Sequence, residues 1–179
     1  KLITYKQLRE LKKKGYDIYV NLCEGYLDWS IPSIDVIYCM ELLGLPFTGP
    51  SSLLYDPTKE LMKYVAFTCG VKTPAFVLLQ NLDEIDSIAS QLQFPLFVKP
   101  SKAGDSLGVD EKSLVHDVTA LKKKAESIIE EYGPLLVEEY IAGREFTALV
   151  IASPDENGAA RVLQPIEYIF PEGFAFKTY

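Results

Sequence analysis

A short apolar strand that leads into a loop of small residues limits how this chain folds more than any other segment. Residues 95–108 read PLFVKPSKAGDSLG. Residues 96–98 form the continuous apolar run that is typical of a buried strand. The run ends at Lys99, and a loop with Gly104, Ser106 and Gly108 follows. The segment therefore predicts a buried strand that places one lysine at the start of a loop.

Two interpretations fit Lys99 and the loop behind it. A lysine ammonium beside inward-turned backbone N–H groups suits the negative charge of a polyphosphate. An exposed lysine in front of an ordinary surface loop gives the same pattern. This segment alone leaves both interpretations open.

Composition narrows the class of protein. Hydrophobic residues make up 48% of the 179 positions, which is enough for a real core in one large domain or two small ones. The net charge of −7 argues against a nucleic-acid or membrane-surface binder. No apolar run reaches membrane-spanning length, and no signal peptide is visible.

The cysteines and the histidine exclude several kinds of site. Cys23, Cys39 and Cys69 are widely spaced and form no C-x-x-C motif, which favours a reducing, cytoplasmic compartment over a disulfide or zinc framework. His116 is the only histidine, so a site with two histidine ligands cannot form.

The first third of the chain predicts a parallel α/β unit. A capping-box pattern starts a helix at 4–14, and residues 17–22 predict a strand with Ile18 and Val20 on one face. A second helix is predicted from Pro32 to residue 43, and a short extended piece covers 45–48. Strand, helix and strand in this order favour a parallel sheet.

The remainder predicts a mixed α+β unit. Asp56 is expected as the N-cap of a helix that ends at Gly70. Pro74 predicts an edge position or strand entry for residues 71–79. The other expected helices are 82–91 and 117–131, and the other expected strands are 94–99, 135–140, 145–152 and, as a hairpin partner, 161–168. The predicted division is a partial N-terminal domain (1–52), a second subdomain (53–141) and the start of a third (142–179).

Further candidate residues lie on both sides of the opening segment. Lys59 and Lys63 are four residues apart and share a helix face, either as a solvated basic stripe or, for Lys63, as a second cation that points the same way as Lys99. Residues 138–141 read EEYI after an apolar run, which fits an edge strand with a wet face. It also fits a connector that hydrogen-bonds a flat heterocycle. Glu145 could accept hydrogen bonds from ribose hydroxyls or pair with Arg144.

Taken in order, these motifs resemble the ATP-grasp superfamily, and within it the D-alanine–D-alanine ligases and their relatives. The similarity is collinear and covers most of the chain from about residue 18. The motifs that carry it are GLPFTGPSS (44–52), the Lys59–Lys63 pair, GVKTP (70–74), FPLFVKPSKAGDSLGV (94–109), LVEEYIAGREFT (136–147) and the PEGFAFKTY tail.

The resemblance implies an ATP cleft between two α+β subdomains, preceded by part of a parallel α/β domain. Eight positions of this sequence would line that cleft. They are Lys63 and Lys99 at the phosphates, Ser106 and Gly108 in a loop over the triphosphate, Glu138, Tyr140 and Ile141 around the adenine, and Glu145 at the ribose.

The implied activity is an ATP-dependent carboxylate–amine ligase that works through an acyl phosphate with Mg²⁺. Its substrates would be a small carboxylate and an amine, amino acids among them, and a homodimer is implied as well. The family's metal ligands, an acidic pair and an asparagine on later strands, have no counterpart before Tyr179. The expectation is therefore an incomplete chain, truncated before the metal-ligand strands and inactive alone.

Two departures from the family pattern leave the substrate open. Cys23-Glu24-Gly25 stands where these ligases usually have His-Gly, and Asp105-Ser106 stands where they usually have two serines. Glu24 and Asp28 are candidates for contacts with a substrate amine. The alternative function is a non-catalytic nucleotide-binding or scaffold module of ATP-grasp shape.

Overall fold

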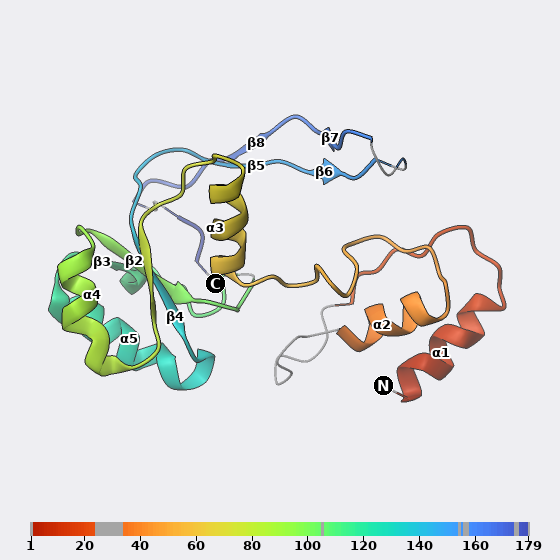
Figure 1. Ribbon diagram of the computed structural model, residues 1–179, viewed down its shortest axis with the longest axis horizontal. Helices are drawn as coiled ribbons and strands as arrows, with labels where there is room; N and C mark the ends of the chain where they lie inside the picture. Colours follow the sequence, from red (N-terminus) through yellow and green to blue (C-terminus); the bar gives the residue numbers. More distant parts are fainter. Residues whose placement is uncertain are drawn as a thin grey trace. The chain divides into compact units, whose positions relative to one another are not determined.

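The computed structural model describes residues 2–23, 34–104, 106–153, 155, 158–173 and 176–178. Glu24, Asp28 and Asp105, which the sequence singled out, lie outside the described residues. The chain separates into two compact units, Lys1–Pro57 and Thr58–Tyr179, and each is described by itself (Figure 1). The division predicted from the sequence at residues 52 and 141 stays a prediction.

The first unit packs two helices against one extended segment. Helix α1 spans Leu2–Lys12 and helix α2 spans Ile34–Leu42. Gly44 adopts a φ of 61° two residues after the end of α2, as expected for a glycine that ends a helix. Six buried residues of this unit form one hydrophobic cluster, which consists of Leu8, Tyr19, Cys39, Met40, Leu43 and Leu45.

The strand predicted at 17–22 is reduced to one parallel bridge. Tyr19 pairs with Phe47, its N–H donates to the Pro46 carbonyl at 2.8 Å, and the Thr48 N–H donates back to its carbonyl at 3.0 Å. Ile18 and Val20 are exposed. The parallel pairing is confirmed, but the length was wrong, because only the 45–48 segment pairs with it among the described residues.

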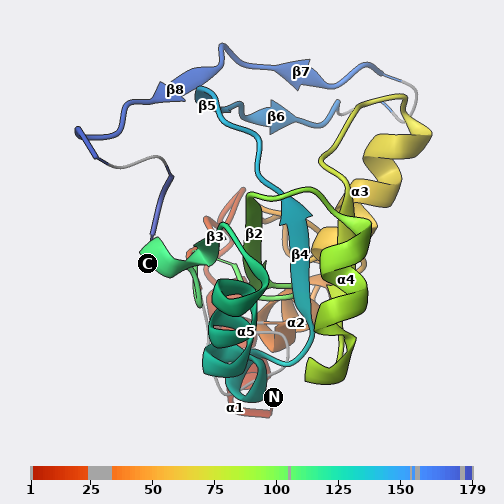
Figure 2. The same cartoon turned by 90° about the vertical axis from the view of Figure 1, so that its left-hand side faces the viewer.

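The second unit is built on a four-stranded antiparallel sheet. Its strands are β1 (Phe76–Leu79), β2 (Leu96–Pro100), β3 (Leu114–Val115) and β4 (Leu135–Glu139), in the order β1-β4-β2-β3. Figure 2 shows β4, β2 and β3 side by side. The edge position that Pro74 predicted for the strand behind it is confirmed. The edge-strand interpretation of residues 138–141 was wrong, because Glu138 and Glu139 belong to β4, which lies between β1 and β2 and pairs with both.

Two helices cover one face of this sheet. A different set of side chains lies on the opposite face, which we call the open face. Helices α4 (Ile85–Gln91) and α5 (Val118–Tyr132) pack on one face (Figure 2). The short 3₁₀ turns η1 (Leu82–Glu84) and η2 (Glu111–Ser113) precede α4 and β3. The core lies between these helices and alternate strand residues, among them Leu79, Leu96, Val98, Leu135 and Val137. Since successive strand residues point to opposite faces, Phe76, Phe97, Lys99 and Glu138 point to the other face.

Local capping signals set the helix bounds. Asp117 accepts a hydrogen bond from the Ala120 N–H at 2.8 Å and caps α5, as predicted. The N-cap predicted at Asp56 was wrong, because α3 spans Lys59–Thr68 and Thr58 caps it through the Leu61 N–H. Asp56 has a φ of 49°, whereas an N-cap residue needs an extended backbone.

A long two-stranded ribbon follows the sheet. Strands β5 (Glu145–Thr147) and β8 (Ile166–Tyr168) pair antiparallel, as do β6 (Val150–Ile151) and β7 (Arg161–Val162). The predicted hairpin is confirmed, although the continuous strand predicted at 145–152 is interrupted at residues 148–149. Among the described residues, no helix has the length and apolar character needed to cross a membrane.

Candidate nucleotide-binding site

Two lysines meet on one carboxylate at the open face of the four-stranded sheet. The Lys63 ammonium lies 2.7 Å from Oε2 of Glu138, and the Lys99 ammonium donates to Oε1 of the same side chain. Lys63 also donates to the Pro74 carbonyl at 3.2 Å. We call Lys63, Lys99 and Glu138 the lysine–glutamate triad.

Three separate elements position the triad. Glu138 is in the central strand β4, and the adjacent β2 places Phe97 directly opposite it and Lys99 two residues further on. Lys63 comes from the second turn of α3. The sequence expectation that Lys63 and Lys99 point the same way is met, because one carboxylate binds both.

Two members of the triad are buried, and the triad carries excess positive charge. Glu138 is 8% exposed and Lys63 is 9% exposed, so both charges have lost most of their hydration. Two ammonium groups and one carboxylate sum to +1. Phe76 lies under the Lys63 ammonium at 4.8 Å from its ring centroid, and such a ring stabilises a cation without neutralising it. The arrangement is therefore suited to a further anionic partner.

Aromatic rings continue the same face of the sheet. The rings of Phe97 and Tyr140 stack at 6.3 Å, and Phe176 meets Phe97 edge-on at 4.8 Å. The Lys99 ammonium lies 5.8 Å from the Phe97 ring centroid, so the rings and the triad are contiguous. This aromatic cluster of Phe97, Tyr140 and Phe176 gives a flat ligand an apolar surface next to a positive charge.

The loop behind β2 is bound to α3 where it begins. Ser101 is 3% exposed, and its hydroxyl donates to Oε1 of Glu60 at 2.6 Å. The Lys59 ammonium donates to the Ala103 carbonyl at 2.6 Å. Burial opposes ionisation of Glu60, but hydrogen bonds, first of all from Ser101, outweigh burial and lower its pKa. Helix α3 thus holds both Lys63 and the start of the loop.

The far end of the loop is bound to α5. The ammonium of Lys124 donates to the Gly108 carbonyl and to Oδ1 of Asp110, both at 2.9 Å. Ser106 and Gly108 have φ angles of 60° and 72°, so the backbone turns sharply between the two anchored ends. Burial raises the pKa of Asp110, but the hydrogen bond and charge of Lys124 outweigh it, and the pKa lies below its usual value.

The remaining predicted residues lie further along the chain. Ile141 and Glu145 are exposed, and Glu145 is paired with Tyr168 in the β5–β8 ribbon. Arg144 makes a bidentate contact with Glu167 at 2.6 and 2.7 Å, so the described ion pair of Arg144 is with Glu167 and not with its neighbour in sequence. The structure therefore brings together Lys63, Lys99, Glu138 and Tyr140. It places Ser106 and Gly108 in the loop after β2, Ile141 between β4 and β5, and Glu145 in the ribbon.

Several residues of the site escaped the sequence reasoning. Phe97 could have been found, because it lies two residues before Lys99 and so shares its face of the strand. Phe76 and Lys124 gave no local signal, since their contacts depend on strand order and on helix packing. Phe176 lies in the PEGFAFKTY motif, but the sequence assigned it no role. Among the described residues, no group of three or more His, Cys, Asp and Glu side chains is placed to hold a metal ion.

Comparison with known proteins points to one family. A family model described as the D-ala D-ala ligase C-terminus matches residues 64–177. A D-alanine–D-alanine ligase from Bordetella petrii is 35% identical over 174 residues, which are 94% of this chain and 49% of that protein. The chain therefore spans about half the length of such curated relatives.

Solved structures show the same fold. The D-alanine–D-alanine ligase of Helicobacter pylori superposes with a TM-score of 0.64 at 24% identity, over 89% of this chain and 49% of that one. The Bacillus anthracis D-alanine–D-alanine ligase complexed with ATP gives a TM-score of 0.59 at 24% identity, over 93% of this chain and 56% of that one.

Proposed function

Since this chain belongs to the D-alanine–D-alanine ligase family, we propose that it supplies ATP-binding residues to an ATP-dependent carboxylate–amine ligase. The ATP-grasp fold predicted from its sequence is that of the solved relatives. One observation carries the proposal, namely that Lys63 and Lys99 converge on Glu138 beside the aromatic cluster.

The residues on this face fit ATP by charge and by shape. Counted over the described residues, the triad carries a formal charge of +1 in a chain whose net charge is −7, so it is a local site for an anion. Charge-assisted bonds from lysine to phosphate oxygens are among the stronger hydrogen bonds in proteins. The aromatic cluster lies within reach of Lys99 and offers its ring surface to an adenine.

We assign roles to the eight predicted residues on this basis. Lys63 and Lys99 bind phosphate oxygens, and Glu138 holds their ammonium groups at the sheet face. Backbone N–H groups at Ser106 and Gly108 cover the phosphates. Tyr140 and Ile141 border the adenine together with Glu138, and Glu145 binds the ribose.

The chemistry itself comes from the nucleotide and its metal. Bound ATP–Mg²⁺ supplies a phosphoryl group that activates a carboxylate for attack by an amine. The lysines contribute charge neutralisation and alignment, which dominate catalysis of phosphoryl transfer. We propose an amino acid as substrate, D-alanine first, since the relatives carry that substrate in their names.

The assembly around the site is part of the same proposal. Residues 53–141 and 142–179 would form the two subdomains that enclose the nucleotide, after a partial domain at 1–52. A cytoplasmic homodimer is the expected state, and sedimentation analysis of the intact protein tests the dimer.

Product analysis of the intact protein tests the function. With ATP, Mg²⁺ and D-alanine, we expect release of ADP and phosphate that depends on the amino acid, together with a dipeptide. A panel of other small carboxylates and amines would identify a different substrate pair. Binding of ATP–Mg²⁺ without phosphate release for any pair would contradict the ligase and favour the non-catalytic module.

A further inference from the structure

Lys124 is a buried charge in the middle of α5. It is 4% exposed, and the cluster of buried residues around α5 includes Leu121, Ala125 and Ile128. A buried ammonium is costly unless it is paired and hydrogen-bonded. Both of the described partners of Lys124 lie in one short segment, the Gly108 carbonyl and the Asp110 carboxylate. The charge therefore connects the helix to the end of the β2 loop.

The backbone at Gly108 is closely packed as well as hydrogen-bonded. A Cβ atom at this position would lie 2.7 Å from Cγ of Pro100 and 3.3 Å from Cε2 of Tyr132. Pro100 ends β2 and Tyr132 ends α5, so Gly108 is pressed between the strand and the helix. Lys124 binds the carbonyl of this residue and fixes its orientation.

Asp110 extends the connection to the next element. Its Oδ1 accepts from the Lys112 N–H at 2.9 Å as well as from Lys124, and it caps the 3₁₀ turn η2. The bonds of α3 to Ser101 and Ala103 hold the start of the loop, and those of Lys124 in α5 hold its end. Two different helices therefore hold the loop.

We propose that Lys124 is a positioning residue for nucleotide binding, because it fixes the exit of the loop at residues 108–110. It acts through the loop and does not touch the nucleotide itself, since its hydrogen bonds are directed at Gly108 and Asp110. We call the hydrogen bonds of Lys124 to Gly108 and Asp110 the clamp on the loop. The identity of the ligand rests on the proposed function, but the clamp can be measured without any ligand.

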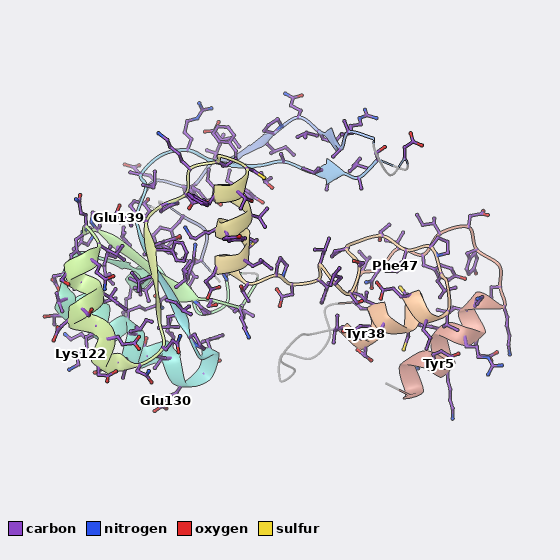
Figure 3. All side chains as sticks on the ribbon, in the orientation of Figure 1. Tyr5, Tyr38, Phe47, Lys122, Glu130 and Glu139 are labelled. Atoms are coloured by element: carbon purple, nitrogen blue, oxygen red, sulfur yellow. The ribbon has the colours of Figure 1, made fainter. Side chains whose placement is uncertain are left out.

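Lys124→Met in the intact protein is the first test. We expect the KM for ATP to rise about tenfold, which corresponds to about 1.4 kcal/mol, while the KM for the amine substrate and the melting temperature change little. Methionine fills a similar volume and removes the charge from the buried position, and the Asp110 carboxylate that loses its partner is 58% exposed and stays hydrated. The matched control is Lys122→Met on the exposed surface of the same helix, which should leave both KM values unchanged (Figure 3).

Amide hydrogen exchange in the nucleotide-free protein is the second test. The N–H groups of Leu107 and Val109 donate to Gly104 and Ser106 at 3.0 and 2.9 Å. We expect them to exchange about tenfold faster in Lys124→Met and at the unchanged rate in Lys122→Met. Asp110→Asn keeps the cap on η2 but removes the charge, and it should show the same effect more weakly. It serves as the test if the methionine variant fails to fold.

The outcomes separate the two proposals. A wild-type protein that binds no nucleotide would refute the proposed function, and the exchange rates would still decide about the clamp. Unchanged exchange and an unchanged KM for ATP in Lys124→Met would overturn the clamp. A parallel rise of both KM values with a lower melting temperature would also overturn it, because that result indicates a general structural role.

Discussion

Lys63 forms an ion pair with Glu138 at 2.7 Å, and this contact joins helix α3 to the central strand of the sheet. Lys99 binds the other oxygen of the same carboxylate, so both lysines share Glu138 as their acidic partner. The position of both lysines on the open face of the sheet therefore depends on one side chain.

Replacing Glu138 by glutamine should destabilise the protein strongly. The change leaves two ammonium groups at a largely buried position without their counter-charge, and loss of one partner from a buried ion pair costs about 3–5 kcal/mol. Urea denaturation of the intact protein measures the loss. Glu130→Gln on the exposed surface of α5 is the control and should stay within about 0.5 kcal/mol (Figure 3). A Glu138 variant as stable as that control would contradict the structural role of the triad.

Lys99→Ala should weaken ATP binding by roughly tenfold or more, because it removes a charge-assisted bond to a phosphate oxygen. Stability should fall less than in Glu138→Gln, since Lys63 still pairs with the carboxylate. Calorimetric titration of the intact protein with ATP and Mg²⁺ gives the affinity, with Lys122→Ala as the control. Unchanged affinity in Lys99→Ala would remove the support for a phosphate site at the end of β2.

Sequence reasoning succeeded where the structural signal is local. Helix α5 was predicted within one residue at each end, because Asp117 provides a capping carboxylate and Gly133 allows the chain to leave the helix. The strand before Lys99 was recognised from its apolar run in the same way. Residues 17–22 show the alternation that is typical of a strand, yet they form a single bridge. Strand formation also depends on partners from elsewhere in the chain.

The triad could not be assembled from the sequence. Lys63, Lys99 and Glu138 were all identified, but their contact requires β4 to insert between β1 and β2 in one particular register. Register is decided by long-range packing of the two sheet faces. For the same reason the sequence did not predict that the Glu138 side chain binds both lysines.

Gly108→Ala should destabilise the loop by about 1–3 kcal/mol. Its φ of 72° is unfavourable for alanine, and the new methyl group would lie 2.7 Å from Pro100. The matched control is Gly104→Ala in the same loop, where an added Cβ meets no atom within 4 Å. The melting temperature and the affinity for ATP should both fall for Gly108→Ala and stay near the wild-type values for Gly104→Ala. Equal effects of the two variants would argue against the close packing at Gly108.

Acidification should weaken the attachment of the loop at both ends. Interactions with Lys124 and with Ser101 hold the pKa values of Asp110 and Glu60 below their usual range, against the effect of burial. A carboxyl group with a lowered pKa binds fewer protons in the folded state than in the unfolded state. Its contribution to stability is therefore complete at neutral pH and is lost as the pH falls through the folded-state pKa.

The pH dependence of the melting temperature measures this contribution. We expect the wild-type protein to lose stability below about pH 5, and Asp110→Asn to lose less over the same range, because one of the responsible groups no longer titrates. At neutral pH Asp110→Asn should be less stable than the wild-type protein, since the charge that faces Lys124 is gone. Parallel curves for the two proteins would show that the Lys124–Asp110 contact does not contribute to the acid sensitivity of the fold.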